Sequence, residues 1–124
     1  MSENSSEALA EFLKARVGDH LRSVIFYDDE GGEVVYVRDD VADQYTDEDV
    51  AEVVRDVRLE AVDKPHQESL YTHGSLECTL RSFGDAVELH FPHDETCGTA
   101  VALDSEVFPM HNTFVERCLD AMEE

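Results

Sequence analysis

The densest group of metal-binding residue types lies near residue 90, in the segment His-Phe-Pro-His-Asp-Glu-Thr-Cys. Imidazole and thiolate are good zinc or copper ligands, and a strand that ends in a turn could bring His90, His93 and Cys97 together. His73 and His111 are candidates for a fourth ligand. The spacing is not specific, because a proline lies between the two histidines and no cysteine pair follows. The ordinary alternative is that His90 faces solvent while His93 caps a turn.

The same segment offers two arrangements used in catalysis. Asp94 and Glu95 could form an acid–base pair near His93, and Cys97 could act as a nucleophile. A cysteine nucleophile needs an electropositive setting that lowers the thiol pKa, and the surface of this chain is overwhelmingly negative. Paired carboxylates also occur by chance in such a sequence. We therefore expect a non-enzymatic protein without a cofactor.

A second group of candidate residues combines polar and aromatic types in two predicted loops. Loops are where binding residues gather on a rigid scaffold, so these positions are candidates for contact with a partner. They are Arg38, Asp39 and Tyr45 in one loop, and Tyr71 and His73 in the other. The alternative is ordinary turn capping by the aspartate and arginine side chains.

The elements that must position these residues begin with a helix and a hairpin. Residues 6–17 predict a helix with an apolar face, which includes Phe12. Residues 21–27 and 33–37 are rich in Val and Tyr and predict two strands. The turn over residues 28–32 contains two glycines, both of which can take a positive φ.

The clearest helix start in the chain is at Thr46, a hydroxyl cap followed by three acidic residues. Apolar side chains then recur at the i, i+3, i+4, i+7 spacing of a helix with one buried face. They are Val50, Val53, Val54, Val57, Ala61 and Val62. We expect Lys64-Pro65 to end this helix and residues 66–75 to form a long connection.

Three further strands and a helix are predicted in the remainder of the chain. Residues 76–82 and 86–91 alternate in polarity, and a short turn between them would place Arg81 opposite Glu88. Residues 99–103 are nearly all apolar, which is typical of a strand with little exposure on either face.

The last helix opens at Pro109 and has a continuous apolar side. That side consists of Met110, Phe114, Val115, Cys118, Leu119 and Met122. The predicted element order is therefore α-β-β-α-β-β-β-α. An α/β (α+β) domain with a five-stranded, mainly antiparallel sheet and about three helices is the simple solution. We expect a single domain over residues 1–124, with residues 1–5 disordered.

The net charge of the chain indicates which classes of partner are favoured and which are excluded. The chain has 30 Asp+Glu against 9 Lys+Arg, for a formal net charge of -21, and the acids are scattered along its whole length. Carboxylates scattered along the whole chain favour adaptation to molar intracellular salt over binding to one cationic partner. At about 1 M salt the Debye length is only about 3 Å, so the repulsion between scattered acids is largely screened. The same charge argues against nucleic acid and anionic membranes as ligands. The absence of a long apolar run or a signal peptide indicates a cytoplasmic protein.

Four stretches are similar to a small haloarchaeal family of single-domain proteins, from which no activity carries over. They are Val37-Arg-Asp-Asp-Val41, Gln67-Glu-Ser-Leu-Tyr71, His90-Phe-Pro-His93 and Phe114-Val-Glu-Arg-Cys118. The element order also resembles the roadblock/LC7 family of profilin-like domains. That resemblance implies a homodimer that serves as a scaffold or regulator of a small GTPase or motility system.

Together these observations predict a halophilic, cytosolic interaction or regulatory domain that forms a homodimer and acts on another cytosolic protein. The alternative is a small-molecule or metal sensor that uses the segment from His90 to Cys97.

Overall fold

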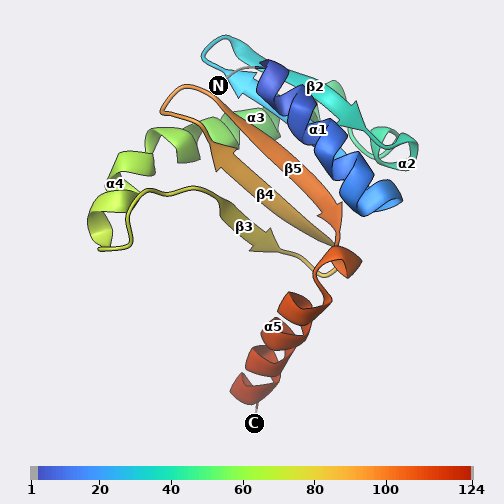
Figure 1. Ribbon diagram of the computed structural model, residues 1–124, viewed down its shortest axis with the longest axis vertical. Coiled ribbons are helices and arrows are strands. Elements are labelled where there is room, and N and C mark those ends of the chain that lie inside the picture. The colour runs from blue at the N-terminus through green and yellow to red at the C-terminus, as the bar shows by residue number, and fades with distance from the viewer. Residues whose placement is uncertain (1–2, 124) are drawn as a thin grey trace.

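Five strands form one antiparallel sheet in the order β2-β1-β5-β4-β3 (Figure 1). In this computed structural model, which describes residues 3–123, the predicted α+β class and the five-stranded antiparallel sheet are confirmed. The strands are β1 (Leu21–Asp28), β2 (Gly31–Val37), β3 (Thr79–Ser82), β4 (Ala86–Pro92) and β5 (Gly98–Asp104). Every residue of β5 as far as Leu103 is buried, as its apolar sequence predicts.

Helix α1 (Glu3–Val17) covers the near face of the sheet in Figure 1. Its Ala10 and Leu13 pack in a cluster with Leu21, Val24, Val101 and Leu103. Phe12, which the sequence placed on the buried face, is exposed instead. The helix begins at Glu3, before the expected start at residue 6. Residues 1 and 2 of the segment expected to be disordered lie outside the described residues.

Helix α3 (Asp47–Val62) crosses the opposite face of the sheet. Thr46 caps it as predicted: its side chain accepts from the backbone N–H of Asp49, whose carboxylate accepts from the backbone N–H of Thr46. The buried helical residues are Val54, Val57 and Ala61, and they pack with Ile25, Tyr27 and Ala100. Val53 and Val62 were expected in the same stripe, but both are exposed.

Two short helices replace segments that were expected to be loops. Helix α2 is Asp39–Ala42, and helix α4 is Lys64–Leu70. Pro65 does end α3, as expected. It also lies in the first turn of α4, where a backbone N–H would have no acceptor within the helix, so proline is tolerated there. Strand β3 then begins only at Thr79, three residues later than expected.

Helix α5 (Pro109–Met122) extends away from the sheet, and no residue of it is buried (Figure 1). Its main contact is with the short helical turn Ser105–Val107, where Asn112 Nδ2 donates to the carbonyl oxygen of Ser105. Within residues 3–123, no helix combines the length and apolar character needed to span a membrane.

Candidate functional site

His90 lies under α3 and not in solvent, so the expected exposed position is wrong: the residue is only 5% exposed. Its Nδ1 lies 3.3 Å from a carboxylate oxygen of Glu60, and its Nε2 lies 2.6 Å from the hydroxyl of Tyr27. Because a carboxylate can only accept, Nδ1 carries the proton and Nε2 accepts from the phenol. Burial raises the pKa of Tyr27, which keeps the phenol protonated, and burial lowers the pKa of His90.

His93 belongs to a separate chain of hydrogen bonds on the α1 side of the sheet. Its Nε2 lies 2.9 Å from Thr99 Oγ1, which lies 2.6 Å from the hydroxyl of Ser6 in α1. Ser6 and Thr99 are both fully buried. The two histidines therefore serve different faces of the sheet, and each has a protein partner for its ring.

Cys97 lies in a turn organised by Asp94. The Asp94 carboxylate accepts from the backbone N–H groups of Thr96 and Cys97 at 2.7 and 2.9 Å, and these bonds lower the pKa of Asp94 to about 2. Burial, followed by the Asp94 charge, raises the pKa of the Cys97 thiol. This setting disfavours the thiolate that a nucleophile or a metal ligand requires.

The three proposed metal ligands do not converge in the structure. Within residues 3–123, the group of three potential ligands whose atoms lie within 4.8 Å of one another is His20, Asp104 and Glu106. One member of that group is already occupied, because Arg38 Nη1 donates to an Asp104 carboxylate oxygen at 2.7 Å.

The Arg38 side chain links the end of β2 to the end of β5. Its guanidinium contacts Asp104 and also donates from Nε to Asp40 at 2.6 Å, and this pairing lowers the pKa of both carboxyl groups. The neighbouring Asp39 is exposed in the first turn of α2, and Tyr45 is half exposed. Arg38 thus takes the structural role that the sequence left open as an alternative.

Tyr71 and His73 lie in the connection after α4, with their rings stacked at a centroid distance of 5.2 Å. Helices α2 and α4 stand at opposite sides of the molecule in Figure 1. The candidate interaction residues Arg38, Asp39 and Tyr45 therefore do not form one surface with Tyr71 and His73.

The sequence did not predict a wide groove, with a volume of about 1050 Å³, between α3, the sheet and the β3–β4 hairpin. A row of aligned residues lies on the sheet side of this central groove: Ser23, Ala102, Glu88 and Arg81, from four adjacent strands. Within the described residues, the Glu88 side chain makes no hydrogen bond or ion pair, and its burial raises the pKa of its carboxyl group. Alternation on β4 was the signal that could have placed Glu88 beside His90.

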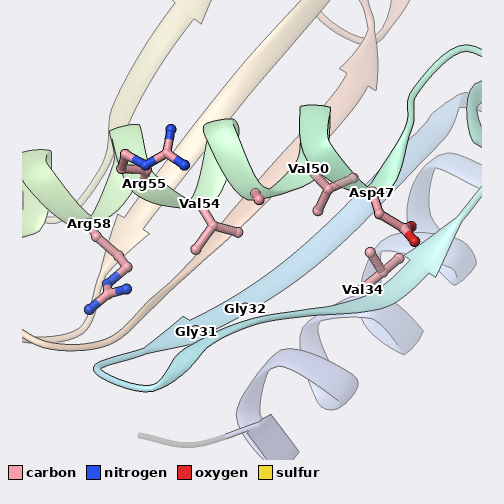
Figure 2. A pocket seen from close by; sticks show the side chains of 9 residues that line it. Gly31, Gly32, Val34, Asp47, Val50, Val54, Arg55 and Arg58 are labelled. Atoms are coloured by element: carbon pink, nitrogen blue, oxygen red, sulfur yellow. The ribbon is translucent and has the colours of Figure 1, made fainter.

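A smaller cavity of about 440 Å³ lies between the edge strand β2 and α3 (Figure 2). We call it the β2–α3 slot. Val34, Val50 and Val54 line its apolar part. Arg55 and Arg58 stand towards one end, and Asp47 stands at the other. In the sequence, the only signal for the β2–α3 slot is the glycine pair in β2, because residues without side chains let a helix approach a strand closely.

Helix α5 presents the largest group of exposed apolar side chains on a single element. Met110, Phe114, Leu119 and Met122 are between 53% and 86% exposed. The sequence identified this apolar side correctly, but it did not show that the side lies away from the sheet.

Comparison with known proteins adds a family to this description. No curated protein matches the chain. One protein-family profile matches residues 7–123, which is nearly the whole length. The chain therefore belongs to the family described as a domain of unknown function (DUF7522).

Proposed function

We propose that this protein is a non-enzymatic interaction domain that forms a homodimer through α5 and serves a partner protein in a salt-rich cytosol. The observation that carries the proposal is the exposed apolar side of α5, a helix with no buried residue. A helix of this length is marginal in water by itself, so its stability depends on packing of its apolar side.

A second copy of the chain is the occupant that fits α5 best. Two copies bring identical stripes, which suit the self-complementary contact of a twofold dimer. Helix α5 also carries few charges for so acidic a chain: Glu116, Asp120 and the opposing Arg117. Two α5 helices can therefore approach with little of the repulsion that other surfaces of the chain would cause.

Two further points support a scaffold and not an enzyme. Two of the side chains that suggested catalysis are engaged in local structure, with Asp94 capping a turn and His93 bonded to Thr99. The resemblance to roadblock/LC7 domains points the same way, because it implies a homodimeric scaffold or regulator. The high negative charge supports a halophilic setting, in which salt screens repulsion between the acids.

Light scattering in about 2 M KCl, where charge repulsion is screened, tests the proposal. We expect the wild-type chain to have twice its monomer mass of 14.0 kDa. Phe114→Asp places a charge in the apolar stripe and should give a folded monomer. Thr113→Asp adds the same charge on the polar side and should remain a dimer. A wild-type protein that stays monomeric at high concentration would refute the dimer.

The alternative, a small-molecule or metal sensor, is supported by one specific observation. His90 lies in the wall of the central groove close to the unpaired carboxylate of Glu88. Elemental analysis of protein purified without chelator tests the metal version. One equivalent of metal that is lost in His90→Gln would support it, whereas metal-free protein with the same melting temperature before and after chelator treatment would remove it.

A further inference from the structure

The β2–α3 slot lies at an open edge of the sheet (Figure 2). Strand β2 pairs with β1 on one side, and it is the last strand of the sheet on the other. An edge strand presents backbone N–H and C=O groups that can pair with an added strand. The slot therefore combines a backbone template with an apolar wall contributed by α3.

The glycines of β2 bring the strand and the helix unusually close. A Cβ atom on Gly32 would lie 2.5 Å from Cγ2 of the buried Val54, so only glycine allows the helix to rest at that height. Gly31 has a φ of 145°, which other residues rarely adopt. Because neither residue has a side chain, the backbone of β2 stays accessible from the slot.

The charges at one end of the slot are not neutralised by the chain's own acids. Arg55 makes no ion pair within residues 3–123, and Arg58 donates only to the backbone carbonyl of Asp29, at 3.0 Å. By contrast, Arg22, Arg38 and Arg81 are each paired with carboxylates. In Figure 2 the two side chains leave α3 in different directions, and Arg58 is the one that reaches towards the turn of β2. In a chain with 30 acids, an arginine without a carboxylate partner offers a local site for an anionic group.

The length of the slot sets the size of the occupant. Asp47 and Arg58 are eleven residues apart on α3, which at about 1.5 Å per residue corresponds to about 16 Å. An extended strand rises about 3.3 Å per residue, so about five residues fill that distance.

We propose that the β2–α3 slot binds an extended segment of a partner protein, about five residues long, which adds to β2 as a sixth strand and places a carboxylate at Arg58. Alternate side chains of the segment enter the apolar part of the slot against Val34, Val50 and Val54. The carboxylate is either the C-terminus of the segment or an acidic side chain within it. The inference rests on the proposed interaction role and supplies a binding site for the partner.

The test uses three synthetic pentapeptides rich in Val and Thr, titrated into the full chain and followed by NMR. The first has a free C-terminal carboxylate, the second is amidated, and the third is amidated but carries an internal glutamate. We expect the first or third to bind at least tenfold more tightly than the second and to shift the amide signals of β2. Preference for the first assigns a C-terminus, and preference for the third assigns an acidic side chain.

Two matched variants and one further peptide make the outcome decisive. Arg58→Gln should abolish the preference for a carboxylate, whereas Arg16→Gln at an exposed position of α1 should leave it unchanged. N-methylation of the central peptide bond should weaken binding, because it removes a donor for the strand pairing. Equal affinity of all three peptides, or no binding, overturns the slot proposal. Light scattering on the same samples measures the dimer separately, so failure of the slot proposal can be distinguished from failure of the dimer proposal.

Discussion

Helices α3 and α5 have similar lengths and comparable apolar stripes, yet only α3 is packed against the sheet. Helix α3 has 16 residues and buries Val54, Val57 and Ala61, whereas α5 has 14 residues and buries none. The difference shows that an apolar stripe predicts that a helix face will be covered, but not which surface will cover it.

Local interactions hold α3 in place more firmly than α5. Helix α3 begins with a complete capping box at Thr46, and its later turns are tied down by Arg81, which pairs with Asp56 and Glu60 of the helix. Helix α5 begins after Phe108 without a side-chain cap. Its beginning is held mainly by the hydrogen bond from Asn112 to Ser105. We therefore expect α3 to depend on the fold of one chain and α5 to depend on a second copy.

The largest expected effect is that of salt, which should distinguish the two helices within one molecule. Transfer from about 1 M to about 0.1 M KCl lengthens the Debye length from about 3 Å to about 10 Å. The summed repulsion should then remove much of a net stability of about 5–15 kcal/mol. The acids of α3 outnumber those of α5: Asp47, Glu48, Asp49, Glu52, Asp56 and Glu60.

Circular dichroism melts across a salt series measure this effect, and hydrogen exchange locates it. We expect α3 to lose protection as salt is lowered. At low salt, protonation of carboxylates near pH 4–5 should restore part of the stability, because their pKa values are about 4 in model compounds. A melting temperature that does not change with salt would contradict this prediction.

A buried charge should affect the two helices in opposite ways. Val57→Asp places a carboxylate in the apolar contact between α3 and the sheet, and we expect it to cost about 4 kcal/mol or more and to prevent stable folding. Leu119→Asp on α5 should leave the unfolding free energy of the monomer nearly unchanged and weaken only the dimer. Denaturant titrations at several protein concentrations measure both effects. Equal destabilisation of the monomer by the two variants would break the comparison.

A moderate effect is expected from pH in about 2 M KCl, where carboxylate repulsion is screened. Burial lowers the pKa of His90 and His93, while unfolded histidine titrates near 6.5. Below about pH 6.5 the unfolded chain therefore takes up protons that the folded chain does not, so stability is present above that pH and is lost as the pH falls. The slope should reach about 1.4 kcal/mol per pH unit for each histidine.

His90→Gln should remove its share of that slope, and a denaturant midpoint measured from pH 7.5 to pH 5.5 detects the loss. Asp104, whose pKa Arg38 lowers, acts in a separate window, because its contribution is lost only as the pH falls below about 4. An unchanged slope in the variant would mean that the environment of His90 does not control the titration.

The smallest effect concerns the start of α3. Thr46→Ala removes the hydroxyl that accepts from Asp49 and should cost about 1 kcal/mol. Thr113→Ala in α5 removes a hydroxyl that donates to the carbonyl of Pro109 inside the helix, and it should cost far less. Thermal melts of the two variants at equal salt compare them. A larger loss for Thr113→Ala would contradict the view that α3 carries more of the monomer's stability.

Much of the fold followed from local patterns in the sequence. Alternation and turn residues predicted the strands, and the expected register, with Arg81 opposite Glu88 across β3 and β4, is confirmed. The expected opposite-charge pair does not form, because Arg81 pairs with Asp56 and Glu60 of α3. Thr46 was also correctly predicted to be a helix cap, because its partner Asp49 lies only three residues away in the sequence. The short helices α2 and α4 were missed, because helices of four to seven residues depend on their surroundings more than on propensity.

The candidate sites were less predictable, because they depend on contacts between distant residues. His90 was expected in solvent, and only the position of Glu60, thirty residues away, reveals its buried partner. The two arginines of the slot looked ordinary in sequence, since nothing local shows that the nearby Asp56 and Glu60 pair with Arg81 instead. Spacing alone also placed His90, His93 and Cys97 together, whereas the sheet separates the two histidines.

The position of β5 has a consequence for the order in which the protein is made. This strand is the last of the five in the chain, yet it lies between β1 and β4 at the centre of the sheet. During synthesis, the first hairpin and the β3–β4 hairpin can form early but cannot be joined until β5 has emerged. Helix α5 leaves the ribosome only afterwards. The monomer can therefore complete its core before the apolar side of α5 becomes available, which favours folding before assembly.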